Sequence, residues 1–162
     1  MSQTDAHRIA QDFLDRHGEA TMSGDIERTL AWCDIPCTLE TMERKIIVES
    51  NEEMRAICVA FIQRLKTQQL THLARRCLEA DFVDDDTLTA TYESRYVSEG
   101  ARLAEGPYFG FVLLRRRETG WKISSMQFAA AADTTVNATL RDKDPTAERP
   151  GPVTTGADLP EA

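Results

Sequence analysis

The chain has 162 residues and a formal net charge of −8, and 41% of its residues are hydrophobic. This length suits one domain with a full hydrophobic core, and the acidic balance argues against nucleic acid and anionic membrane surfaces as partners. No apolar run approaches the roughly 20 residues of a membrane span. The first residues have no apolar signal core, so we expect a cytoplasmic protein.

Three helices are predicted in the N-terminal half from capping residues and from apolar residues at helical spacing. Thr4 is the candidate N-cap of the first helix, whose apolar stripe runs to His17. Asp25 can cap a short second helix, and Pro36 follows it. Ser50 opens the third helix with a capping box. The third helix has the clearest stripe: Met54, Ile57, Cys58, Phe61, Ile62 and Leu65.

Strands are predicted around and after the third helix. Two short strands are expected over 37–42 and 44–48. From Leu70 onward, apolar residues recur at every second position, which is the spacing of a strand, instead of at helical intervals. Alternation is regular over 87–96, between turn signals at 84–86 and 98–100, and two further long strands are expected over 108–116 and 121–130. Helices followed by a meander of strands predict an α+β fold, with the N-terminal helices packed on a strongly curved antiparallel or mixed sheet around a hollow.

Composition changes after Ala132, because four of the six prolines lie beyond it and no periodic apolar pattern continues. A segment without apolar residues to bury cannot offset the entropy of ordering. We therefore predict a folded domain over residues 1–136 and a disordered acidic tail rich in Pro and Thr over 137–162. The functional alternative for this tail is a docking segment.

The four cysteines are Cys33, Cys37, Cys58 and Cys77. Without an export signal they are expected to be reduced thiols. Neither they nor the three histidines stand at zinc-ligand spacing. We therefore predict no metal and no cofactor.

The segments SGDIERTLAWCD, IVESNEEMRAICVAFIQRL and FVLLRRRETGWKISSMQFA follow one another in this order. In order and spacing they resemble the nuclear-transport-factor-2-like superfamily and, within it, the SnoaL-like branch, over about residues 4–132. The resemblance implies a cystatin-like, cone-shaped α+β barrel and a homodimer formed through the sheet. Members range from isomerases, cyclases and dehydratases to binding domains, so the fold does not give the function.

Ketosteroid isomerase chemistry needs a carboxylate base, a tyrosine and a protonated Asp that holds the enolate oxygen. Against the pattern of that family, the tyrosine position falls on His17 and the base position on Thr41. The position of the second acid falls on Leu113. The resemblance therefore argues against a ketosteroid isomerase.

His17 and Glu40 are the candidate catalytic residues in the hollow, with His17 as general acid or base. A structural His17 bonded to backbone and a solvated Glu40 are the competing interpretations. Glu40 and Thr41 cannot both point inward, because strand side chains alternate. Burial should lower the pKa of His17, whereas an ionised Glu40 nearby should raise it.

The walls of the pocket are predicted from the helices and from the last two strands. Tyr92 and Tyr96, which share one strand face, could present their hydroxyls to a ligand or to a dimer partner, and we assign them to the homodimer surface on the opposite side of the sheet. The predicted pocket residues are Phe13, His17, Thr41, Phe61, Phe109, Phe111, Leu113, Met126 and Phe128.

We expect the protein to bind a small apolar or amphipathic molecule in this hollow without defined catalysis. One alternative is an isomerase, cyclase or dehydratase that uses His17 with a nearby carboxylate. The second is an assembly module that works by dimerisation and whose pocket is incidental. A His17 within reach of Glu40 would favour the enzyme, and a filled hollow without convergent polar groups would favour the assembly module.

Overall fold

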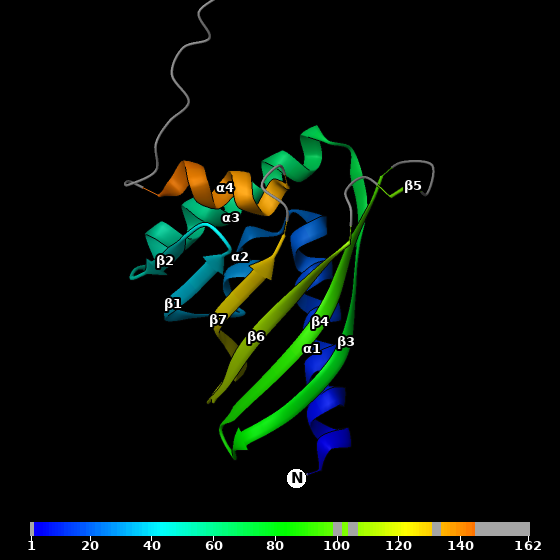
Figure 1. Cartoon of the computed structure of the whole chain (residues 1–162). Helices are drawn as coiled ribbons and strands as arrows, with labels where there is room; N and C mark the ends of the chain where they lie inside the picture. The colour runs from blue at the N-terminus through cyan, green and yellow to red at the C-terminus, as the bar shows by residue number, and fades with distance from the viewer. Residues whose placement is uncertain (1, 99–101, 104–106, 131–133, 145–162) are drawn as a thin grey trace, which may run out of the picture.

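The computed structural model describes residues 2–98, 102–103, 107–130 and 134–144, in which helices lie against one mixed sheet (Figure 1). The helices are α1 (Gln3–Ser23), α2 (Ile26–Leu30), α3 (Asn51–Thr67) and α4 (Thr135–Lys143). None of these described helices is long and apolar enough to cross a membrane.

Polar side chains cap the helices and explain where they begin. Ser2, and not Thr4 as predicted, is the N-cap of α1, so this helix begins earlier than expected. Asp25 caps α2 as predicted, by accepting a hydrogen bond from a backbone amide one turn on. Ser50 caps α3 in the same way, with the Glu53 amide as donor. Each cap satisfies an amide that the helix itself leaves without an acceptor.

The strands form one sheet in the order β2-β1-β7-β6-β4-β3, with the short β5 paired to β4. Only β1 and β7 run parallel among the described pairs. The path ends at β2 and β3, so the predicted curved mixed sheet is present but is not closed. The bounds are β1 (Cys33–Thr41), β2 (Lys45–Val48), β3 (Leu70–Asp84), β4 (Thr87–Ser98), β5 (Arg102–Leu103), β6 (Tyr108–Arg117) and β7 (Gly120–Ala129).

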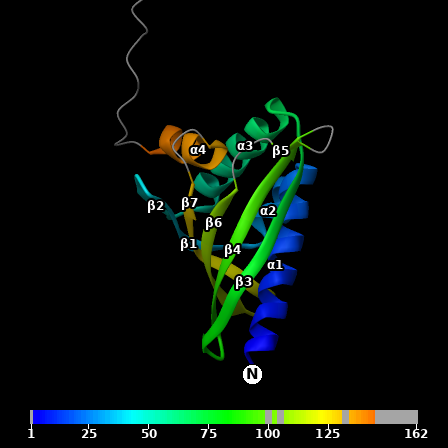
Figure 2. The same cartoon turned by 45° about the vertical axis from the view of Figure 1, so that its right-hand side comes forward.

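The sheet has an inner face that packs against the helices and an outer face that does not (Figure 2). Tyr92 and Tyr96 are fully buried on the inner face, so their assignment to a dimer surface is wrong. Phe109, Phe111 and Leu113 alternate with buried residues of β6 and lie on the outer face, so their assignment to the pocket is wrong as well. A shift of one residue in a strand's register moves its inward side chains to the outer face and the reverse. Because β6 has apolar residues at both odd and even positions, its sequence does not indicate which set points inward.

Helix α4 begins at Thr135 and extends to Lys143, so most of it lies in the segment predicted to be a disordered tail. Thr134 caps it, and Val136 and Leu140 are buried one turn apart against the rest of the core. The prediction of disorder is therefore wrong for residues 137–144, because two apolar residues at helical spacing are too few to recognise in sequence but enough to anchor a short helix. The rest of the predicted tail, 145–162, and most of the predicted turn at 98–100 lie outside the described residues.

Candidate functional site

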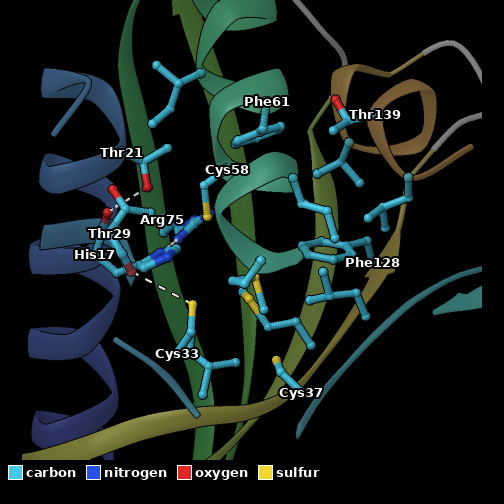
Figure 3. Close-up of a pocket in the computed structure, with 18 residues that line it drawn as sticks. His17, Thr21, Thr29, Cys33, Cys37, Cys58, Phe61, Arg75, Phe128 and Thr139 are labelled. Carbon is cyan, nitrogen blue, oxygen red and sulfur yellow. Dashed lines mark hydrogen bonds between the residues drawn. The ribbon is translucent and has the colours of Figure 1, made fainter. Parts of the chain in front are cut away.

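A cavity of about 80 Å³ lies between the inner face of the sheet and the helices (Figure 3). An apolar cavity of roughly 150 Å³ is known to admit benzene, so this one suits a smaller molecule unless side chains move. Strands β1, β3 and β7 and all four described helices contribute to its wall. The lining residues are His17, Thr21, Thr29, Cys33, Cys37, Leu39, Met54, Ile57, Cys58, Phe61, Ile62, Arg75, Ile123, Met126, Phe128, Val136, Thr139 and Leu140.

Two polar side chains meet at one side of this cavity (Figure 3). His17 comes from α1 and Arg75 from β3, and each is only 8% exposed. The Arg75 Nη1 donates a hydrogen bond to Nδ1 of His17 at 2.8 Å. Because a guanidinium has no acceptor, Nδ1 must be unprotonated and the imidazole proton must be on Nε2.

Burial sets the protonation state of His17. Burial, together with a smaller contribution from the positive charge of Arg75, lowers the pKa of the imidazole to about 3. His17 is therefore neutral at physiological pH, with its basic nitrogen occupied by Arg75. In this state it is a poor general base, but its Nε2–H can donate a hydrogen bond to a ligand.

Glu40 does not reach His17. It lies on the outer face of β1, where its carboxylate accepts a hydrogen bond from the Gln127 amide at 3.2 Å. The predicted pairing of His17 with Glu40 is therefore wrong, since β1 directs Leu39 and Thr41 inward and Glu40 outward. Within the described part of the chain, no Asp or Glu lines the cavity.

Arg75, whose pairing with Arg76 in the sequence favours a solvated cluster over an anion site, lines the cavity although it was not among the predicted pocket residues. Its guanidinium carbon lies 5.7 Å from the centroid of the Tyr92 ring, a cation–π contact. Its Nε is buried without a hydrogen-bond partner, and no described carboxylate forms a salt bridge with it. Arg76, the next residue, points outward and pairs with Glu93 at 3.4 Å. Two adjacent arginines are usually both exposed to solvent. Only their place in a strand with one face covered by helices indicates that one side chain is buried and the other exposed.

The other polar groups in the wall are already engaged or uncharged. The hydroxyls of Thr21, Thr29 and Thr139 each donate to the carbonyl four residues before them, at 2.8–2.9 Å. Of the wall cysteines, Cys33, Cys37 and Cys58 are free thiols. Burial raises the pKa of Cys37 to about 12, so this thiol is neutral. Among the described residues, no group of three His, Cys, Asp or Glu side chains is placed to hold a metal ion.

The remaining predicted pocket residues occupy three kinds of place. Phe13 lies behind the wall, where its ring stacks on His17 with centroids 5.4 Å apart and holds the imidazole in place. Thr41 is buried in the β1–β2 turn, and its hydroxyl accepts hydrogen bonds from the amides of residues 43 and 44. The others are in the cavity wall: His17, Phe61, Met126 and Phe128.

Comparison with known proteins agrees with this architecture. The family model described as "NTF2-like protein (DUF6841)" matches residues 5–131. No curated protein matches the chain at a significant level.

Solved structures with the same fold have diverse descriptions. A domain of unknown function with a cystatin-like fold from Nostoc punctiforme is 16% identical, with a TM-score of 0.62, over 87% of this chain and 86% of that one. A ketosteroid isomerase-like protein from Erwinia carotovora is 13% identical, with a TM-score of 0.58, over 76% and 95%. A candidate dehydratase of the NTF2-like family from Streptomyces avermitilis is 13% identical, with a TM-score of 0.60, over 80% and 99%.

Such low identities show the fold alone and carry no activity from one protein to another. The family match covers most of the chain, and the element order, the curved mixed sheet and the helices on its inner face agree with it. The chain belongs to the NTF2-like family DUF6841.

Proposed function

We propose that the protein binds a small apolar or amphipathic molecule in the cavity, with the polar end of the ligand beside His17 and Arg75. The observation that carries this proposal is the convergence of two buried polar side chains on an otherwise apolar cavity. Ligand sites typically combine apolar walls with a few polar groups that fix orientation.

The arrangement of polar groups also bears on the two alternatives. An isomerase, cyclase or dehydratase that pairs His17 with a carboxylate lacks support, because Glu40 faces the other side of the sheet. Burial of an unpaired cation in the cavity wall costs free energy. If the protein were an assembly module with an incidental pocket, nothing in its function would offset that cost. Binding is therefore the function that the geometry supports best.

Methionine methyl groups provide a direct test with neutral probes. Met54 and Met126 line the cavity, whereas Met42 is 81% exposed and serves as an internal control. In protein labelled with ¹³C at the methionine methyls, titration with butan-1-ol or butanamide should shift the Met54 and Met126 resonances with saturation. The Met42 resonance should stay in place.

Filling the cavity should abolish this response. Cys37→Phe adds a ring at a fully buried position of the wall, and Cys58→Leu is a milder filling variant. Val83→Phe adds the same ring at a 65% exposed position and is the matched control. Absence of saturable shifts at both cavity methionines in the unmodified protein, with these neutral probes and with butanoate, would refute the proposed function.

A further inference from the structure

The cavity wall includes a buried positive charge that no carboxylate of the described residues neutralises. Arg75 is 8% exposed, its recorded partners are a neutral histidine and an aromatic ring, and its Nε has no acceptor. A charge removed from water without a counter-ion is expensive, so buried cations are normally paired with anions. Among the described residues that line the cavity, none supplies that anion.

The second polar group of the cavity is also a donor. Because Nδ1 of His17 accepts from Arg75, the ring carries its proton on Nε2. No described residue accepts a hydrogen bond from this Nε2–H. The wall threonines direct their hydroxyl protons to their own helices, as described above. His17 and Arg75, which both line the cavity, are thus donors and not acceptors on this side of the wall.

Further unsatisfied hydroxyls lie beside Arg75 on the inner face of the sheet. Ser94 is the β4 residue paired with Arg75 in the β3–β4 register, and its Oγ is buried without a partner. The hydroxyl of Tyr92, two residues earlier on the same face, is also buried without one. Both hydroxyls are able to donate. Neither residue lines the cavity, so the donors of Arg75 and His17 are the groups that favour an acceptor-rich, negatively charged group there.

We propose that the natural ligand is a small organic acid, whose carboxylate accepts hydrogen bonds from Arg75 and from Nε2–H of His17 while its apolar body fills the cavity. This inference rests on the proposed function and specifies its ligand class. A carboxylate has two planar oxygens that match the fork of a guanidinium. It also carries one negative charge against the one buried positive charge, whereas a phosphate dianion would leave a second charge uncompensated.

The test compares acids with neutral isosteres in the same methionine NMR titration at pH 7. The first pair of probes is butanoate and butanamide. The second pair, benzoate and benzamide, has a larger apolar group and would bind only if side chains of the cavity wall move. Each amide preserves the shape of its acid but lacks the charge. The acid should bind at least about tenfold more tightly than its amide, because hydrogen bonds between charged groups are roughly twice as strong as neutral ones.

Two variants assign this preference to Arg75. Arg75→Gln removes the charge and should bring the acid to the affinity of the amide, whereas Arg75→Lys keeps the charge and should retain part of the preference. Arg76→Gln is the matched control, since Arg76 is the neighbouring arginine on the outer face. It should leave the preference unchanged.

The outcomes separate the two proposals. Equal affinity for acid and amide in the unmodified protein would overturn the organic-acid inference and leave binding of neutral ligands intact. An acid preference that persists in Arg75→Gln, or that disappears in Arg76→Gln, would also overturn it, because the anion would then sit elsewhere. If neither acid nor amide binds, the proposed function fails and the inference fails with it. The comparison on the unmodified protein remains decisive even if a variant does not fold.

Discussion

His17 illustrates how neighbours decide what a titratable side chain can do. The ring of Phe13 stacks against its face, Arg75 occupies Nδ1, and burial disfavours the imidazolium. These three effects act together to keep the ring neutral and fixed in one tautomer. His17 is therefore suited to orient a ligand by donation from Nε2, rather than to exchange protons near neutral pH.

The lowered pKa of His17 predicts a specific loss of stability in acid. The unfolded chain titrates near the ordinary value of 6.5 and the folded protein near 3, so below about 6.5 protons bind the unfolded state preferentially. The stability associated with a neutral His17 is complete above pH 6.5 and falls as the pH drops toward 3. Between pH 7 and pH 5 this one group should cost about 2 kcal/mol of unfolding free energy.

Urea denaturation at the two pH values measures this effect. His17→Gln keeps a polar group for Arg75 but removes the titration, so this variant should lose about 2 kcal/mol less than the unmodified protein on acidification. His72→Gln changes an exposed histidine of β3 and is the control. An identical pH dependence in the unmodified protein and His17→Gln would contradict the assignment of a buried, neutral His17.

At the scale of elements, α4 completes the cavity. Its Val136, Thr139 and Leu140 line the wall, and the helix packs on α3. Thr139 lies across the cavity from the His17–Arg75 pair (Figure 3). The helix is short, so its stability depends on this packing more than on helix propensity. The site is therefore assembled from segments at both ends of the folded region.

Leu140→Ala should test whether α4 is a packed part of the domain. Leu140 is 3% exposed, and truncating such a buried leucine to alanine should lower the free energy of unfolding by about 2–5 kcal/mol. Lys143→Ala, at an exposed position of the same helix, should change it by less than about 0.5 kcal/mol. Equal effects of the two substitutions in urea denaturation would mean that α4 does not pack in solution as described.

At the scale of the molecule, none of the described helices covers the outer face of the sheet. Phe109 of β6 and Ile47 of β2 are 58% and 54% exposed there, and Phe111 and Leu113 lie on the same face of β6 as Phe109. Large exposed apolar side chains on one face are typical of association surfaces. The homodimer expected from the sequence is therefore proposed to form through these residues, in place of Tyr92 and Tyr96.

Light scattering tests the homodimer directly. We expect about twice the chain mass of 18.2 kDa at micromolar concentration. Phe109→Asp should shift the protein toward the monomer, because it places a charge among the exposed apolar side chains of the outer face. Val83→Asp, at an exposed position near the end of β3, should leave the mass unchanged. A monomer at micromolar concentration in the unmodified protein would exclude this dimer.

The sequence by itself determined the fold class, since capping residues and the change of apolar period from helical to alternating are local signals. Asp25 and Ser50 cap the helices as predicted, and the stripe of α1 directs His17 inward. The tertiary structure alone decided which side chains of β6 point inward, because apolar residues occur at both odd and even positions of that strand. It also decided that Arg75 is buried and Arg76 is not, and that α4 folds onto the cavity. Burial depends on what packs from elsewhere in the chain, and no local pattern around Arg75 or Leu140 encodes those distant partners.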